Sequence, residues 1–260
     1  MSLDAETTIL AEYKGDTVVL TLNRVAKKNS IDEMLLAELH HQLDLAEQNE
    51  DCRVLVLQGQ EGIFSSGMDF SHLLNQQGDE TKLLQRSDEI GYARLLRRIT
   101  ESSIIFISAV DGDVMAGGVG IVAASDLVFA TPRSFFRLTE AMWGLIPANV
   151  TPYLIRRIGF QPAFRMAITL ENVSASEAKK MNLVDFIAED LEKEIKKKRL
   201  MLRRIESQTV GELKQFFRSQ WFASEDLERE ADKKMRGYAN DKKLVDNLNR
   251  YVHQGLFPWE

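Results

Sequence analysis

Short apolar runs alternate with helical patterns along the first two thirds of this chain of 260 residues. Runs rich in β-branched and apolar residues occur at 17–22, 53–57, 104–110 and 127–130. After the first run, Asp32 precedes apolar residues at helical spacing: Leu35, Leu36, Leu39, Leu43 and Ala46. Strands separated by helices pair in parallel through right-handed crossovers. The sequence therefore predicts an α/β fold, with further helices over 83–99 and after Ala116 and a glycine-punctuated loop over 59–67.

The last third of the chain has a different character. From Ser174 the patterns are almost entirely helical, and Ser174 with Glu177 forms a capping-box motif. An amphipathic helix is expected over 224–251, and no linker rich in Pro, Gly or Ser interrupts this region. We expect a core over 1–195 and a helical region over 196–260 that packs on the core or on a neighbouring subunit.

Composition excludes several classes of protein. The net charge of −6 provides no domain-wide basic surface, so we expect no nucleic-acid partner. A single cysteine, Cys52, cannot form an internal disulfide. No apolar run approaches the roughly 20 residues of a membrane span. No signal peptide and no paired metal ligands are recognisable. We therefore expect a cytoplasmic protein without metal or membrane partner.

Two small-residue turns and one carboxylate point to chemistry. Segment 64–69 (FSSGMD) contains Gly67, and segment 116–120 (AGGVG) places Gly117 at a helix start. The N–H groups of Met68 and Gly117 can converge on one carbonyl oxygen, where the helix dipole adds to their effect. Glu140 can move protons beside that oxygen, an arrangement suited to thioester enolate chemistry. Spacing alone equally allows two ordinary glycine turns and a carboxylate at a helix N-terminus.

A nucleotide-binding alternative rests on the segment 118–123 (GVGIVA), which has the G-x-G-x-x-A form. That motif begins in the turn directly after a strand and is followed by an acidic residue about 20 positions later. Here residues 111–117 intervene after the strand, so this is the weaker alternative.

The order of motifs resembles the crotonase (enoyl-CoA hydratase/isomerase) superfamily, most strongly over 23–178. The motifs are Asn23-Arg24, Asn29-Ser30, 64–69, 107–112, 116–118, 125–130, Glu140 and 144–147. The resemblance implies a ββα-spiral core, a C-terminal helical region that forms trimers, and an acyl thioester carried on CoA or phosphopantetheine with no other cofactor. It implies an oxyanion hole at Met68 and Gly117, catalysis by Glu140, and substrate contacts from Ser65, Ser66, Gly67, Gly118, Trp143 and Asn149.

One departure from the superfamily pattern is informative. Its hydratases hold a water between two glutamates; the first position falls on Gly120 here and the second on Glu140. A single glutamate can still remove a proton from C2 and return it, either to a departing hydroxyl at C3 or to C4. Dehydration and isomerisation therefore fit better than ordinary hydration.

A narrower resemblance separates these options. Segments 144–148, 152–159, 202–205 and 255–260 are similar to the crotonase-type dehydratases of polyketide β-branching cassettes. The resemblance implies dehydration of 3-hydroxy-3-methylglutaryl-acyl carrier protein to 3-methylglutaconyl-acyl carrier protein, by a homotrimer or hexamer. A single-glutamate isomerase or hydratase acting on a CoA thioester is one alternative, and a noncatalytic acyl-binding subunit is another.

Two further groups of residues are weaker candidates. The substrate's terminal carboxylate needs a polar partner, for which Arg137, His72, Tyr92 and Asn149 are candidates. An acidic carrier protein favours a locally basic docking face, for which the candidates are Arg94, Arg97, Arg98, Arg203 and Arg204. Both groups can equally be surface or supporting residues, and Trp143 can equally be core.

Overall fold

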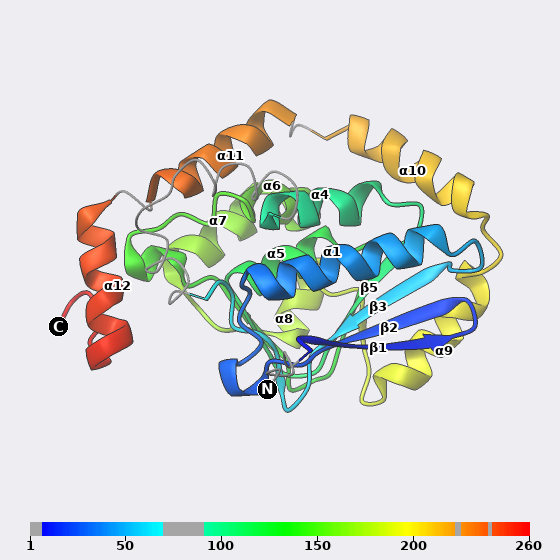
Figure 1. Cartoon of the computed structure of the whole chain (residues 1–260), viewed down its shortest axis with the longest axis horizontal. Coiled ribbons are helices and arrows are strands. Elements are labelled where there is room, and N and C mark those ends of the chain that lie inside the picture. The colour runs from blue at the N-terminus through cyan, green and yellow to red at the C-terminus, as the bar shows by residue number, and fades with distance from the viewer. Residues whose placement is uncertain (1–6, 70–90, 222–224, 239–240) are drawn as a thin grey trace, which may run out of the picture.

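The structure is a computed structural model that describes residues 7–69, 91–221, 225–238 and 241–260. Its larger sheet has the strand order β1-β2-β3-β5-β7-β10. These strands are β1 Ile9–Lys14, β2 Thr17–Leu22, β3 Val54–Gln58, β5 Ile105–Val110, β7 Leu127–Ala130 and β10 Phe186–Ile187. β1 and β2 form an antiparallel hairpin, and all other pairs are parallel. The predicted parallel α/β sheet is confirmed (Figure 1).

A second, four-stranded sheet has the order β4-β6-β8-β9. Its strands are β4 Ile63–Ser65, β6 Asp113–Met115, β8 Phe135–Arg137 and β9 Val173–Ser174. The first three each follow a strand of the larger sheet directly, so the chain repeats a unit of one long strand, one short strand and a helical segment. The predicted loop over 59–67 is therefore wrong in part. β4 has only three residues and is flanked by glycines, so its own sequence carries no strand signal.

Helices pack on the larger sheet and around the second one. They are α1 Glu33–Gln48, α4 Tyr92–Glu101, α5 Gly117–Ala124, α6 Thr151–Ile158, α7 Phe160–Thr169 and α8 Ala175–Lys180. Asp32 caps α1 by accepting from the Leu35 N–H at 2.9 Å, and the capping box of Ser174 and Glu177 opens α8. Of the helix predicted over 83–99, residues 83–90 lie outside the described residues and the rest begins α4. All eight residues of α5 are buried.

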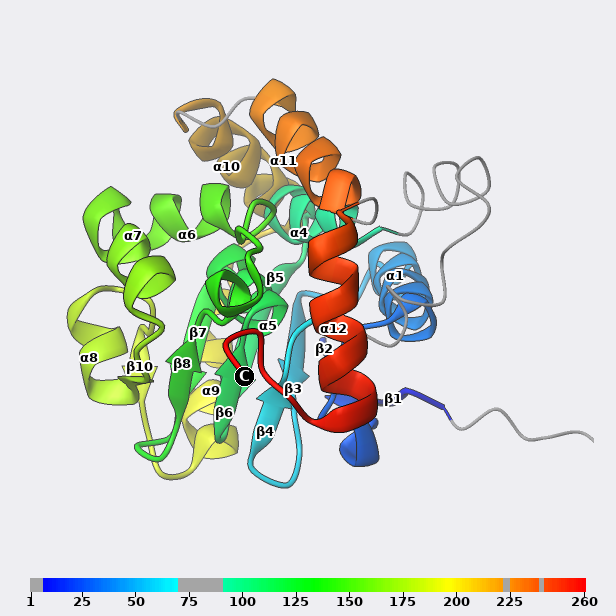
Figure 2. The ribbon, with the colours of Figure 1, turned by 90° about the vertical axis from the view of Figure 1, so that its left-hand side faces the viewer.

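The C-terminal region continues with α9 Leu191–Leu202, α10 Ser207–Ser219, α11 Glu225–Gly237 and α12 Lys242–Gln254 (Figure 2). The single helix predicted over 224–251 is wrong, because α11 ends at Gly237 and Asp241 caps a new helix by accepting from the Leu244 N–H. The predicted boundary at residue 195 falls inside α9, and the division into two units stays a prediction. Among the described residues, no helix is both long and apolar enough to cross a bilayer.

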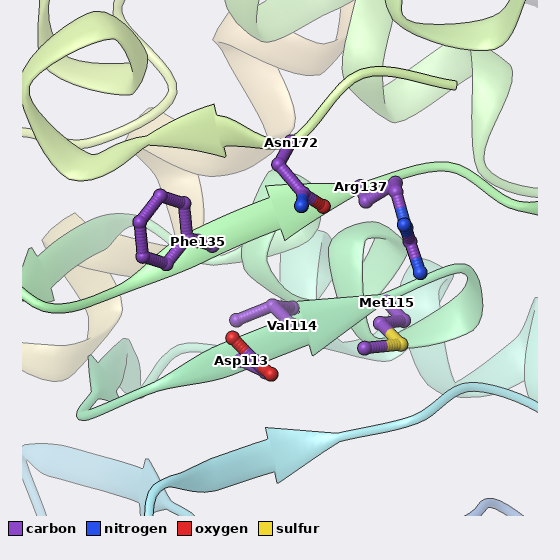
Figure 3. Close-up of a pocket in the computed structure, with 6 residues that line it drawn as sticks. All are labelled: Asp113, Val114, Met115, Phe135, Arg137 and Asn172. Atoms are coloured by element: carbon purple, nitrogen blue, oxygen red, sulfur yellow. The ribbon is translucent and has the colours of Figure 1, made fainter.

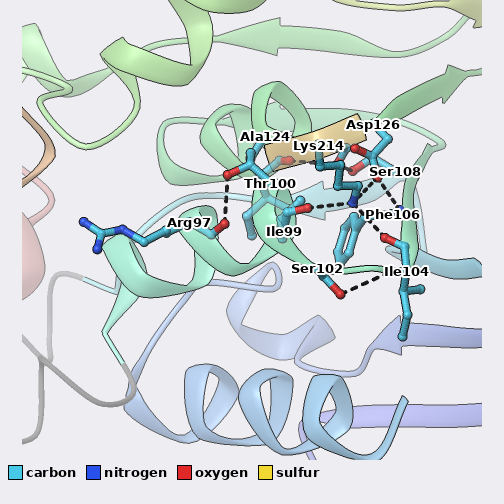
Figure 4. Close-up of polar contacts among 12 residues, drawn as sticks. Arg97, Ile99, Thr100, Ser102, Ile104, Phe106, Ser108, Ala124, Asp126 and Lys214 are labelled. Carbon is cyan, nitrogen blue, oxygen red and sulfur yellow. Dashed lines mark hydrogen bonds and ion pairs between the residues drawn. The ribbon is translucent and has the colours of Figure 1, made fainter. Parts of the chain in front are cut away.

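A buried lysine attaches α10 to the core. Lys214 Nζ donates to the carbonyl oxygens of Ile99 at 3.0 Å and Ile104 at 2.7 Å, and lies 2.6 Å from an Asp126 oxygen (Figure 4). Asp126 also accepts from the Phe106 N–H at 2.7 Å. Because three acceptors surround an ammonium group that has three donors, the buried charge is fully compensated. The helical region is therefore docked by specific contacts as well as by apolar burial.

Candidate active site

The two predicted turns lie against each other. Gly67 has φ +88°, and a Cβ added there would lie 2.6 Å from the Ala116 Cβ and 3.2 Å from the Gly117 nitrogen. Only glycine fits this position, because both the backbone conformation and the approach of Ala116 exclude a side chain. Ala116 itself has φ +47°, a strained value for a residue with a Cβ. Segments 50 residues apart in the sequence therefore form one continuous wall.

The two predicted oxyanion donors have no acceptor within the part of the chain that the structure describes. Met68 pairs with Ile31 in a parallel bridge, in which the Ile31 N–H donates to Gly67 O and the Asp69 N–H donates to Ile31 O. In this geometry the N–H of Met68 points away from Ile31. Gly117 is the first residue of α5, where a backbone N–H has no partner inside the helix. Both amides are therefore unpaired among the described residues, and their convergence on one substrate oxygen stays a prediction.

Ser65 and Ser66 hold the first turn in place. The buried Ser65 hydroxyl donates to Asn29 O at 2.9 Å and accepts from the Gly67 N–H at 3.2 Å. The Ser66 N–H donates to Lys28 O at 3.0 Å. A Cβ on Gly118 would lie 3.0 Å from the Ser65 Cβ, so the second turn packs directly on the first. The structure thus places Ser65 and Gly118 as supports of the turns, and their contact with substrate stays a prediction.

Glu140 is the first residue of the 3₁₀ helix η2 (Glu140–Trp143), and only 8% of it is exposed. Its carboxylate accepts from the Thr139 N–H at 2.9 Å. Burial raises the pKa of Glu140 above its ordinary value, and the hydrogen bonds from the backbone N–H groups of Thr139 and Glu140 oppose this rise. A carboxylate tuned in this direction is a stronger base than an exposed glutamate, as proton abstraction from carbon requires.

Tyr92, the first residue of α4, joins the parts of the site. Its buried hydroxyl donates to Gly117 O at 2.5 Å. A Cβ on Gly120 would lie only 2.1 Å from the Tyr92 hydroxyl oxygen. Burial raises the pKa of Tyr92 well above its usual value, and the negative charge of Glu140 raises it further. Tyr92 is therefore close enough to Glu140 to interact with its charge, and its hydroxyl occupies the space beside Gly120. Sequence reasoning named Tyr92 only as one carboxylate partner among several.

Other predicted residues lie elsewhere or serve different contacts. Trp143 packs its ring on Tyr251 at 4.7 Å and on Phe257 at 5.9 Å, as part of a cluster with α12. The buried Oδ1 atom of Asn149 has no hydrogen-bond partner among the described residues, which leaves it available to a ligand. His72 lies outside the described residues. No metal-binding cluster of His, Cys, Asp or Glu occurs within the described segments.

Arg137 lies in a separate pocket of about 220 Å³ on the second sheet. Its lining consists of Asp113, Val114, Met115, Phe135, Arg137 and Asn172, and so includes neither turn nor Glu140 (Figure 3).

Two of the basic docking candidates form ion pairs inside the chain. Arg97 pairs with Glu228 at 2.9 Å, and Arg98 pairs with Asp44 at 2.7 Å and Glu47 at 2.8 Å. These two arginines therefore stabilise helix packing.

The nucleotide-binding alternative does not fit the geometry. β6 lies between β5 and α5, so the glycines do not follow a strand of the larger sheet directly. Gly118 packs on Ser65 and Gly120 packs on Tyr92 and Val150, so neither glycine of the motif has open space beside it for a pyrophosphate.

The repeated strand–strand–helix units and the C-terminal helices define the class: this is a protein with the crotonase fold. The sequence model described as enoyl-CoA hydratase/isomerase matches residues 12–260. The chain belongs to the enoyl-CoA hydratase/isomerase family.

Similar proteins support the same assignment. The bacillaene synthase dehydratase PksH of Bacillus subtilis (strain 168) is 31% identical over 265 residues, covering 100% of this chain and 99% of PksH. The crystal structure of a B. subtilis polyketide biosynthesis enoyl-CoA hydratase (pksH) has a TM-score of 0.87 at 29% identity, covering 96% of this chain and 99% of that chain. An enoyl-CoA hydratase structure from Mycobacterium avium has a TM-score of 0.81 at 28% identity, covering 99% and 100%. The predicted superfamily, fold class and hydro-lyase character are confirmed.

Proposed function

We propose that this enzyme dehydrates 3-hydroxy-3-methylglutaryl-acyl carrier protein to 3-methylglutaconyl-acyl carrier protein in polyketide β-branching. The observation that carries the proposal is the buried carboxylate of Glu140 combined with glycine at position 120, where the hydratase pattern has a second carboxylate. Without that carboxylate, α5 contributes no acid or base to the reaction, so one group must both take the proton and give it back. By microscopic reversibility, the same group would serve the reverse addition of water, and the direction is set by the substrate that is supplied.

The proposed steps use Glu140 and the amides of the two turns. The thioester oxygen accepts from the N–H groups of Met68 and Gly117, which stabilise the enolate when Glu140 removes a proton from C2. The C3–O bond then breaks, a C2–C3 double bond forms, and the proton returns from Glu140 to the leaving hydroxyl as water. The unpartnered Asn149 Oδ1 is a candidate acceptor for a polar hydrogen of the substrate.

The full-length similarity to PksH, a dehydratase named after bacillaene synthase, supports a substrate carried by a synthase. Relatives named enoyl-CoA hydratases, such as EchA19 of Mycobacterium tuberculosis at 29% identity over 188 residues, favour a CoA thioester as the second candidate. A noncatalytic acyl-binding subunit would need neither a buried base nor free amides. The carrier-protein partner and the trimer or hexamer belong to this proposal; apolar side chains exposed on α7, Phe160, Phe164 and Ile168, are consistent with self-association.

Intact-protein mass spectrometry tests the proposal directly. 3-Hydroxy-3-methylglutaryl-carrier protein and the matching CoA thioester are each incubated with the enzyme and with Glu140→Gln, which removes the base and keeps the side-chain volume. We expect the carrier-bound substrate to lose one water with the wild type, at a rate about a hundred- to ten-thousand-fold above the variant. Faster turnover of the CoA thioester would favour the second candidate. Equal rates for wild type and variant would contradict a catalytic Glu140.

A further inference from the structure

The position of Tyr92 raises a question that Glu140 and the two amides leave open. Elimination creates negative charge on two oxygens: the thioester oxygen first, and then the hydroxyl that leaves C3. The two amides stabilise only the first. Glu140, protonated by the first step, supplies the proton for the leaving hydroxyl, but none of these groups holds that oxygen in place while the C3–O bond breaks. A further donor would orient the oxygen and share its developing charge, which is costly to leave uncompensated in a buried site.

Tyr92 is placed to supply that donor. Its hydroxyl donates to Gly117 O in the first turn of α5. The N–H of the same residue, Gly117, is one of the two amides proposed to bind the thioester oxygen. The hydroxyl also lies where a side chain at position 120 would begin, 2.1 Å from a Cβ built there. Burial raises the pKa of Tyr92, and the negative charge of Glu140 raises it further, so the hydroxyl keeps its hydrogen at neutral pH. A neutral donor close to a carboxylate base is a suitable pair for removing and replacing one proton.

We propose that Tyr92 is a catalytic residue whose hydroxyl, released from Gly117 O when substrate binds, donates a hydrogen bond to the departing oxygen at C3. The inference rests on the proposed dehydration. Glu140 takes the proton from C2, and the electron pair of that C–H bond enters the enolate. The C3–O bond then breaks toward the oxygen held by Tyr92, and the proton returns from Glu140 to form water. Tyr92 ends the cycle with the hydrogen that it began with, so atoms and charges balance.

Gly120 is the complement of this tyrosine. Any side chain at position 120 would overlap the Tyr92 hydroxyl and come within 3.0 Å of Val150 Cγ2. A tyrosine at position 92 therefore requires glycine at position 120. The space that a side chain on α5 would fill is occupied by the phenol of Tyr92 on α4. A Gly120→Ala substitution keeps the phenol but displaces it, which provides a second variant for the test.

The experiment compares the wild type, Tyr92→Phe, Gly120→Ala and a matched control, Tyr153→Phe. Tyr153 is also buried and is close enough to Tyr92 to raise its pKa, but its own hydroxyl donates to Glu228 at 3.0 Å. Dehydration of 3-hydroxy-3-methylglutaryl-carrier protein is measured with hydrogen and with deuterium at C2. Thermal unfolding verifies that each variant is folded.

We expect Tyr92→Phe to slow dehydration about a hundredfold, as losing one donor to a developing oxyanion does, and Tyr153→Phe to leave the rate within about twofold. The C2 isotope effect should fall toward one in Tyr92→Phe and Gly120→Ala, because breaking the C3–O bond becomes the slow step. A rate within twofold of wild type in Tyr92→Phe would overturn the inference. A slow Tyr92→Phe variant with an unchanged or larger isotope effect would also overturn it, because Tyr92 would then assist proton removal from C2 and not the breaking of the C3–O bond. A wild-type enzyme that leaves this substrate intact would instead overturn the proposed function itself.

Discussion

At the scale of single residues, Glu140 combines an exceptional position with an ordinary side chain. Its carboxyl is buried at the start of η2, and the N–H groups of Thr139 and of Glu140 itself compensate it only in part. The folded state therefore favours the protonated form of this residue. A buried carboxylate weakens the fold whenever it is ionised, a cost that the proposed role of Glu140 as the base would explain.

The raised pKa of Glu140 makes the effect of Glu140→Gln on stability depend on pH. The raised pKa of Glu140 gives a contribution to folding that is fully present below the ordinary pKa of 4.5 and is lost as pH rises through the folded pKa. Glutamine does not ionise. We therefore expect the Tm of Glu140→Gln minus that of the wild type to rise with pH across that window, leaving the inactive variant the more stable one at neutral pH.

Glu177→Gln is the matched control of opposite sign. Hydrogen bonds from the Ser174 side chain and backbone lower the pKa of this exposed carboxyl, so its contribution is present above the ordinary pKa and lost in acid. Differential scanning calorimetry between about pH 4 and 8 measures both variants. A Tm difference for Glu140→Gln that is independent of pH would contradict a raised pKa.

Some of the candidate site residues could be predicted from the sequence and others could not. Gly67, Gly117 and Glu140 stand in recognisable motifs, so their roles could be predicted without the structure. Tyr92 could not be assigned its place, because it depends on how α4 lies across α5 and on the missing side chain at Gly120. A contact between helices 25 residues apart leaves no local pattern in the sequence.

At the scale of elements, α5 holds the site from within the core. At its N-terminus the Gly117 amide has no partner among the described residues, and its C-terminal end is neutralised by arginines of α6. Arg156 donates to Ala123 O at 2.6 Å, and Arg157 donates to Ser125 O at 2.8 Å. Burial lowers the pKa of Arg156 to about 10, so it stays charged at neutral pH. Cations at this end stabilise the helix, whose positive end carries the Gly117 amide.

Gly67→Ala tests the contact between α5 and the first turn. The methyl group must displace Ala116, so both amides shift and we expect a loss of activity of about a hundredfold, with a loss of stability. Gly15→Ala is the matched control, because Gly15 also has positive φ, +65°, with nothing within 4 Å of an added Cβ. It should cost about 1 to 2 kcal/mol from backbone strain and keep full activity. Urea unfolding and the dehydration assay measure both; equal activities would show that the turns need not meet closely.

Elements were predictable to the extent that their signals are local. The Asp32 cap, the Ser174 capping box and the strand β7 are where the sequence predicts them. β4 was missed because three residues cannot establish a period, and its pairing with β6 is set by the sheet. The division between α11 and α12 shows the same limit: an amphipathic pattern continues through Gly237, and only the Asp241 cap marks the new start.

At the scale of the whole molecule, the C-terminal helices connect back to the site. Glu228 of α11 is buried and accepts from Tyr153 at 3.0 Å and from Arg218 at 2.7 Å, besides its pair with Arg97. α12 then places Leu244 and Leu248 against Trp143 and Leu145, next to the residue that carries the base. A region far from the catalytic motifs in sequence thus supports η2. Helical composition predicted these helices but not the face on which they dock.

Leu248→Ala tests whether this support matters for catalysis. Leu248 is 1% exposed, and its truncation leaves a cavity beside Trp143 that should cost about 2 to 5 kcal/mol in the local packing of α12. Trp143 is the last residue of η2 and Glu140 is the first. Weaker packing against Trp143 therefore leaves Glu140, the proposed base, less firmly positioned. We expect kcat to fall about tenfold or more, since displacements near 1 Å suffice for such losses. Val252→Ala, at a 40% exposed position of the same helix, should leave kcat unchanged. Hydrogen exchange should rise over 241–254 and 140–145 together in Leu248→Ala. Faster exchange in α12 alone, with wild-type kcat, would show that the C-terminal helix covers the site without positioning it.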